Sequence, residues 1–189
     1  MNYIFEEILS FLIFICSSLP GRIGIYSRKI LYKFLIKNIG KDFYTENGVV
    51  FSGYKNIIIG NNVRLMRYSS INADDGNVKL GNNISINYNV NINSSGKGSI
   101  IFGDNVLVGQ NTVFRSADHI FKKDQITYNN SHASGKIIIG NNVWIGANCV
   151  ILKNVTIGDN CVIGANSTIT KNIEKNKVVV GLNKVIKEI

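Results

Sequence analysis

The sequence contains little proline, little cysteine and little charge. Among its 189 residues there are one proline and three cysteines, and charged residues make up only 17%. One proline argues against a fold dominated by loops. Cys16, Cys149 and Cys161 are an odd number without the spacing of a disulfide framework, so we expect reduced thiols in a cytoplasmic protein. The hydrophobic content of 45% excludes a disordered chain, and the length suits one main domain.

Histidine and acidic residues are also scarce. The chain has two histidines, and no cluster of His, Cys and acidic residues has the spacing of metal ligands, so we expect no metal site. Lys and Arg number 21 against 12 Asp and Glu, which gives a net charge of +9. This excess favours an anionic partner, namely nucleic acid, a phosphate-bearing cofactor or an acidic membrane surface.

The amino terminus lacks an apolar run long enough to cross a bilayer. Its apolar core, Ile8 to Leu19, has 12 residues, whereas a membrane span needs roughly 20. Glu6 and Glu7 precede it, which fits a cleaved signal peptide poorly. A basic amphipathic pattern follows over residues 25–36. We expect residues 1–44 to be helical and to make peripheral contact with an anionic membrane. The alternative is that both helices pack on the main domain or on a neighbouring subunit.

The rest of the chain is an internal repeat of six residues. From Ile139 an aliphatic residue recurs at every sixth position to residue 169, and the same grid restarts at Ile59, Leu80 and Phe102. Because side chains alternate along a strand, six residues make one short strand and one corner, and three such units close a coil of about 18 residues. The grid predicts a mainly β chain, a parallel β-helix of about five coils. Gly146 is expected to permit a tight turn. Asparagine tolerates left-handed corners, and the repeat places it at residues 61, 62, 82, 83, 141 and 142.

This grid resembles that of the hexapeptide-repeat acyltransferases over residues 45–189. The segment IGNNVWIGANCVILKNVTIGDNCVIGANSTITKNI, residues 139–173, is similar to the sugar O-acetyltransferase branch, which includes galactoside, maltose and polysaccharide acetyltransferases. The resemblance implies a left-handed β-helix, a homotrimer, acetyl-CoA as the donor and a glycan as the acceptor. We therefore divide the chain into a helical segment (1–44), the β-helix (45–176) and a basic tail (177–189).

The stretch SADHIF, residues 116–121, interrupts the grid, and an excursion over residues 120–136 follows. The grid places Asp118 in an inward slot and His119 in an outward one. A buried carboxylate would be costly in that slot, so we expect the strand to end there. An alcohol is a poor nucleophile at neutral pH, and a neutral imidazole is its natural general base. His119 precedes Trp144 by 25 residues, about the family's spacing between its catalytic histidine and this tryptophan. The resemblance therefore implies that His119 is the catalytic base, the alternative being an ordinary turn histidine. We expect His132 to contact the acceptor.

The resemblance also assigns the donor and acceptor residues by position. Trp144 shares an outward apolar stripe with Leu107 and Val162. This stripe fits a subunit interface as well as a contact with pantetheine, and a cleft between two subunits would satisfy both interpretations. Asn89 matches an asparagine that contacts the acceptor or the acetyl oxygen. The acidic acceptor ligand of galactoside enzymes falls at Lys97, so we expect a different acceptor pocket. The residues implied for acetyl-CoA are Trp144, Gly146, Ala147, Ala165, Thr170, Lys171, Lys184 and Lys187.

From these features we expect an acetyl-CoA-dependent O-acetyltransferase acting on a sugar of a bacterial surface polysaccharide or its lipid-linked precursor, at the cytoplasmic face of the membrane. One alternative is an antibiotic acetyltransferase of the same fold, although the loop after His119 looks too short for a streptogramin-type lid. Another is N-acetylation of an amino sugar. A non-enzymatic β-helix scaffold is disfavoured, because carbonic-anhydrase-like members need several ligating histidines. A nucleic-acid role explains the charge but not the repeat.

Overall fold

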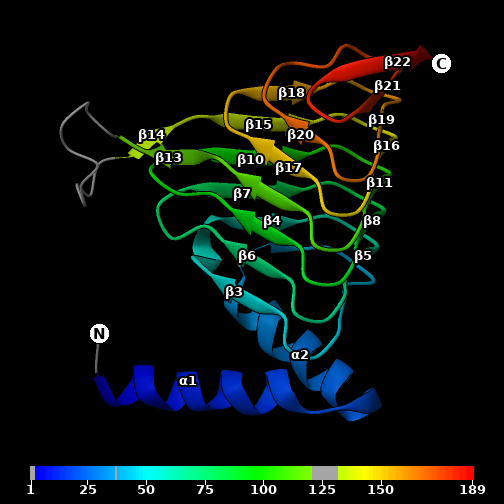
Figure 1. Cartoon of the computed structure of the whole chain (residues 1–189). Helices are drawn as coiled ribbons and strands as arrows, with labels where there is room; N and C mark the ends of the chain where they lie inside the picture. Colours follow the sequence, from blue (N-terminus) through cyan, green and yellow to red (C-terminus); the bar gives the residue numbers. More distant parts are fainter. Residues whose placement is uncertain (1–2, 37, 121–131) are drawn as a thin grey trace.

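The computed structural model describes residues 3–36, 38–120 and 132–189. Short strands coil into a triangular prism, and two helices lie across one end of it (Figure 1). These are α1 (Tyr3–Ser18) and α2 (Gly21–Leu35). Neither helix is long and apolar enough to span a membrane.

Consecutive strands pass to successive walls of the prism, which we name sheets A, B and C. Sheet A contains β1 (Asn38–Ile39), β4 (Ile57–Ile59), β7 (Asn77–Leu80), β10 (Ser99–Phe102), β15 (Lys136–Ile139) and β18 (Val155–Ile157). Sheet B contains β2 (Tyr44–Thr45), β5 (Val63–Leu65), β8 (Ile84–Ile86), β11 (Val106–Val108), β16 (Val143–Ile145), β19 (Val162–Ile163), β21 (Lys177–Val180) and β22 (Lys184–Glu188). Sheet C contains β3 (Val50–Ser52), β6 (Ser70–Asn72), β9 (Asn91–Asn93), β12 (Val113–Arg115), β17 (Val150–Leu152) and β20 (Thr168–Ile169).

The sheets confirm the predicted parallel β-helix, with six coils instead of about five. Sheets A and C each have six strands. The additional coil is the first one, β1 to β3, whose strands have only two or three residues and lack the IGNN pattern of the later coils. The last strand, β22, runs antiparallel to β21 and extends sheet B at the far end.

The aliphatic grid forms the core. All six grid positions from Ile139 to Ile169 are at most 1% exposed. Strand neighbours bring equivalent positions together, as Ile139 beside Ile157 shows. Phe102 and Phe114 fill the fourth coil with their ring centroids 5.0 Å apart, edge to face. Because full burial of each such side chain contributes roughly 1.5–3 kcal/mol, this column is the main source of stability.

Two corners of the prism, A–B and B–C, repeat from coil to coil with the same geometry. Each carries asparagines with positive φ, such as Asn142 (55°) and Asn148 (57°). Their amides form ladders along the axis, and the Asn142 Nδ2 donates to the Asn160 Oδ1 at 2.9 Å. Gly146 lacks a positive φ. A Cβ there would lie 2.6 Å from the Ala165 nitrogen, so this glycine permits close stacking of coils and not the turn itself.

The third corner, C–A, holds the variable segments. Here lie the 3-10 turn Tyr54–Asn56 and, in later coils, residues 73–76 and 94–98 and the described parts of the excursion, 116–120 and 132–135. Coils of different length can therefore stack without disturbing the register of the strands. This corner runs the height of the prism and carries His119.

The helices are anchored by one buried face of α2. Arg28, Tyr32 and Ile36 are each 1% exposed. The Arg28 guanidinium donates to the carbonyl oxygens of Cys16 at 3.0 Å, Leu19 at 2.7 Å and Thr45 at 3.1 Å. One side chain thus joins the end of α1, α2 and the first coil, so the amino-terminal segment packs on the main domain.

Candidate active site

The interruption of the repeat at SADHIF produces a projecting hairpin. After Ala117, which is 2% exposed, the chain leaves the coil as β13 (Ala117–His119) and returns as β14 (His132–Ser134). Asp118 is exposed, so the chain has left the coil before the inward slot that the grid alone would give it, as the cost of burying a carboxylate predicts. An inward carboxylate would lose its hydration without a partner, and the chain leaves the coil before that cost arises. Residues 121–131 of the predicted excursion lie outside the described residues.

The hairpin brings the two histidines together. His119 and His132 face each other in the antiparallel register of β13 and β14. Their ring centroids are 4.6 Å apart, with the rings inclined at 43°. His119 is exposed, as the outward slot predicted. The sequence assigned the two histidines separately, and no spacing rule relates them across the excursion.

Residues above and below the hairpin hold it in place. The Lys153 Nζ, from the next coil, lies 3.1 Å from the Asp118 Oδ2 and donates to the Ala133 oxygen at 3.0 Å. It therefore binds both strands of the hairpin. In the coil below, a Cβ on Gly96 would lie 2.8 Å from the Cβ of His132, so His132 rests directly on this glycine. Sequence reasoning missed Lys153 and Gly96, because both act through contacts between coils.

Replacing Lys153 with methionine is expected to loosen the hairpin and leave the prism intact. Methionine keeps the apolar stem but loses both bonds of the ammonium group, each worth about 1 kcal/mol for a lysine whose side chain is 23% exposed. Amide hydrogen exchange of residues 117–119 and 132–134 should accelerate roughly 5- to 30-fold. Lys153→Arg, which keeps the charge, is the control. Unchanged exchange in Lys153→Met would show that the hairpin does not depend on this lysine.

A second candidate surface lies on the outer face of sheet B. Leu107 and Trp144 are 54% and 56% exposed, and with Val162 and Ile189 they line a shallow groove of about 170 Å³. Adjacent to it, the B–C corners of the fifth and sixth coils present the other residues assigned to the pantetheine. These are Gly146, Ala147 and Ala165.

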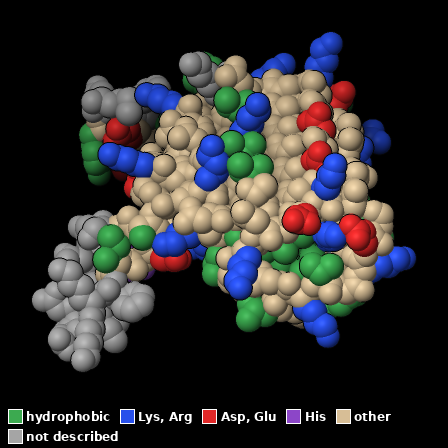
Figure 2. All heavy atoms as spheres, turned by 90° about the horizontal axis from the view of Figure 1, so that it is seen from above, with side chains coloured by type: hydrophobic (Ala, Val, Ile, Leu, Met, Phe, Trp, Pro, Cys, Tyr) green, Lys and Arg blue, Asp and Glu red, His purple; other side chains and the backbone are tan. Residues whose placement is uncertain are grey.

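Basic side chains gather at the end of the prism farthest from the helices. Lys184 and Lys187 are exposed on β22, and Figure 2 looks onto this end of the prism, where the basic side chains are lysines. Lys171 lines a separate hollow that also includes Asn183. Thr170 is bonded to the tail, since the Asn183 amide donates to its Oγ1 at 2.7 Å and accepts from its backbone nitrogen at 2.8 Å.

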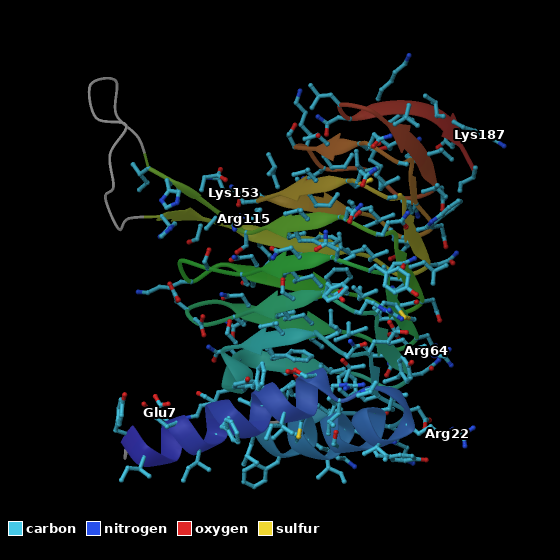
Figure 3. All side chains as sticks on the ribbon, turned by 60° about the horizontal axis from the view of Figure 1, so that its bottom comes forward. Glu7, Arg22, Arg64, Arg115, Lys153 and Lys187 are labelled. Atoms are coloured by element: carbon cyan, nitrogen blue, oxygen red, sulfur yellow. The ribbon has the colours of Figure 1, made fainter. Side chains whose placement is uncertain are left out.

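The two candidate surfaces lie on opposite sides of one chain. The C–A corner of a triangular prism is opposite sheet B, so the hairpin and the Trp144 face point away from each other (Figure 1). Figure 3 places Arg115 and Lys153 at the root of the hairpin and Lys187 on the opposite side of the prism. One chain therefore cannot bring His119 to a ligand bound along Trp144.

Asn89, assigned to the acceptor, lies at the B–C corner. Its φ is 54°, and its Nδ2 donates to the Asn111 Oδ1 at 3.0 Å as part of an asparagine ladder. Within one chain it is at a different corner from His119, and its contact with the acceptor stays a prediction.

Comparison with known proteins gives the class of protein that this fold and site define. Residues 136–171 match the family described as bacterial transferase hexapeptide (six repeats). No curated protein matches the sequence. Together with the solved structures described next, the repeat confirms the predicted resemblance to hexapeptide-repeat acyltransferases and the left-handed β-helix.

Three solved structures show how far the likeness extends. AntD, an N-acyltransferase from Bacillus cereus in complex with dTDP and 3-hydroxybutyryl-CoA, is 26% identical with a TM-score of 0.77, over 87% of this chain and 89% of AntD. A maltose O-acetyltransferase from Clostridium difficile 630 is 28% identical with a TM-score of 0.65, over 97% of this chain and 85% of that one. The hexapeptide-repeat acetyltransferase VCA0836 from Vibrio cholerae, 20% identical with a TM-score of 0.64 over 96% and 89%, shows the fold alone.

Proposed function

We propose that this protein is an acetyl-CoA-dependent O-acetyltransferase that modifies a sugar hydroxyl of a bacterial surface polysaccharide or its lipid-linked precursor. The His119–His132 pair carries the proposal, because the hairpin at the SADHIF interruption presents two adjacent imidazoles, that of His119 exposed. The likeness to a maltose O-acetyltransferase, and to an acyltransferase in complex with an acyl-CoA, supports the choice of donor and reaction.

In the proposed reaction His119 accepts the proton of the sugar hydroxyl as its oxygen attacks the thioester carbonyl of acetyl-CoA. The new carbon–oxygen bond forms, the carbon–sulfur bond breaks, and the CoA thiolate leaves and recovers the proton. Trp144 and the small residues at Gly146, Ala147 and Ala165 fit the slender pantetheine, since no long side chain blocks the corner beside the groove. Lys184 and Lys187 fit the phosphates of the nucleotide as point charges.

The direct test is to offer acetyl-CoA with a panel of glycans and identify the products by mass spectrometry. A mass gain of one acetyl group that mild alkali removes identifies an ester and supports O-acetylation. The second candidate, N-acylation of an amino sugar, is favoured by the likeness to AntD, and its amide product would survive the same alkali treatment. An acetyl product that resists alkali would therefore replace the first proposal with the second.

We further propose that the enzyme is a homotrimer whose site is shared between subunits, because one chain holds the hairpin and the Trp144 face on opposite sides. Co-expressing His119→Ala and Trp144→Ala chains tests this. If each site takes His119 from one subunit and Trp144 from its neighbour, random assembly leaves roughly a quarter of the sites intact. The mixture should therefore regain about a quarter of the wild-type rate at low acetyl-CoA.

The control for this mixture is each variant expressed alone, which should show only its own residual rate. Light scattering should report a trimer for all of them. A mixture no more active than the average of the two separate variants, or an active monomer, would contradict the shared site.

A further inference from the structure

The two amino-terminal helices carry an unusual share of exposed apolar surface. Of 22 exposed large apolar side chains in the described residues, 11 lie on α1 and α2. Single exposed apolar residues are normal on a protein surface, but a contiguous group of them marks an interaction site.

These side chains form one stripe on each helix, turned away from the prism. The opposite face of α1, with Leu9 and Ile13, lines the cleft against the first coil, and the opposite face of α2 buries Arg28 and Tyr32. The stripes therefore face outward beneath the molecule, as the view onto the helices shows (Figure 3). The stripe of α1 centres on Ile4, Ile8, Phe11 and Ile15, with Tyr3, Leu12 and Phe14 at its borders, and that of α2 consists of Ile23, Tyr26, Ile30 and Phe34.

A row of basic residues borders the stripe of α2. Arg22, Lys29 and Lys33 recur at intervals of seven and four residues, which places them on one side of the helix next to the stripe. The 15 residues of α2 include no acidic residue. An apolar face bordered by Lys and Arg is the arrangement of helices that lie in the interface of an anionic membrane.

We propose that α1 and α2 form a platform that binds the surface of an anionic lipid bilayer. The apolar stripes enter the boundary between headgroups and acyl chains, and Lys29 and Lys33 meet the lipid phosphates. The platform lies across one end of the prism (Figure 1). In subunits that associate side by side, the platforms all face the same direction, so one flat membrane could bind all of them at once. This inference does not rest on the proposed acetyl transfer.

Flotation of the full-length protein with vesicles tests the proposal. Vesicles containing phosphatidylserine should carry the protein to the top of the gradient, and vesicles of phosphatidylcholine alone should carry much less. Ile30→Glu combined with Phe34→Glu should weaken binding more than tenfold, because both side chains lose their place among the lipid chains. Lys29→Glu and Lys33→Glu should each weaken it at least roughly fivefold, and added salt should mimic their effect.

The matched control is Ile186→Glu, at the opposite end of the prism from the helices. The Ile186 side chain is 55% exposed, comparable to the 72% of Ile30 on α2, so it tests the same substitution away from the platform. This variant should float as the parent does. The proposal is overturned if the parent protein does not float with phosphatidylserine vesicles. It is also overturned if the double variant Ile30→Glu and Phe34→Glu floats normally but has a different molecular mass in light scattering. The latter result would assign the stripes to a second copy of the chain. The failure of this inference can be distinguished from the failure of the proposed function. A platform variant that no longer floats should still transfer acetyl groups to a soluble glycan.

Discussion

His119→Ala is expected to lower kcat by about 10²–10⁴-fold, the usual cost of removing a general base. Acetyl-CoA affinity and assembly should remain nearly unchanged, because His119 is exposed on the hairpin and adds nothing to the core. Steady-state kinetics, with calorimetry for acetyl-CoA binding, measure both quantities.

His132→Ala is the natural comparison for this variant, since its ring packs on that of His119. We expect a milder loss, because the base remains and only its neighbour is removed. If His132→Ala abolishes turnover and His119→Ala retains it, the two roles are exchanged. If both variants keep near-normal turnover, the hairpin is not the site of catalysis.

Arg28→Met is expected to destabilise the amino-terminal helices by about 3–5 kcal/mol. Burial lowers the pKa of the Arg28 guanidinium, because the charged form loses its hydration. Three carbonyl oxygens accept hydrogen bonds from the guanidinium and compensate for that loss. Methionine would fill part of the space and leave those oxygens without their donor. Urea unfolding should show the loss, and hydrogen exchange should locate it in α1 and α2.

Arg22→Met is the matched control, because Arg22 lies on the same helix and is exposed. Its free energy of unfolding should change by less than about 0.5 kcal/mol. Equal stability of the two variants would mean that the aromatic and aliphatic contacts of Tyr32 and Ile36 hold the helices without the guanidinium.

The sequence predicted the prism because the hexad grid is a local rule repeated many times. Every aliphatic position read from Ile139 is buried. The first coil escaped prediction because two of its three grid positions are occupied by Thr45 and Phe51 and not by aliphatic residues. At Asp118 the grid alone would place the side chain inward, and the cost of burying a carboxylate correctly predicts that the chain leaves the coil there. His119 was found from the interruption, whereas its contact with His132 and the support from Lys153 depend on how separate coils stack, which no single-sequence pattern encodes.

The confinement of length changes to the C–A corner separates parts of the fold that tolerate insertion from parts that do not. An insertion at an A–B or B–C corner would break the asparagine ladders and displace the hydrogen-bonding partners of later strands. An insertion at the C–A corner disturbs neither, as the hairpin itself demonstrates. Segments at the C–A corner can therefore change in length one coil at a time, while the outer face of sheet B keeps its form. Under the proposed function, such a scaffold could take a different acceptor at this corner and keep the surface proposed for the donor.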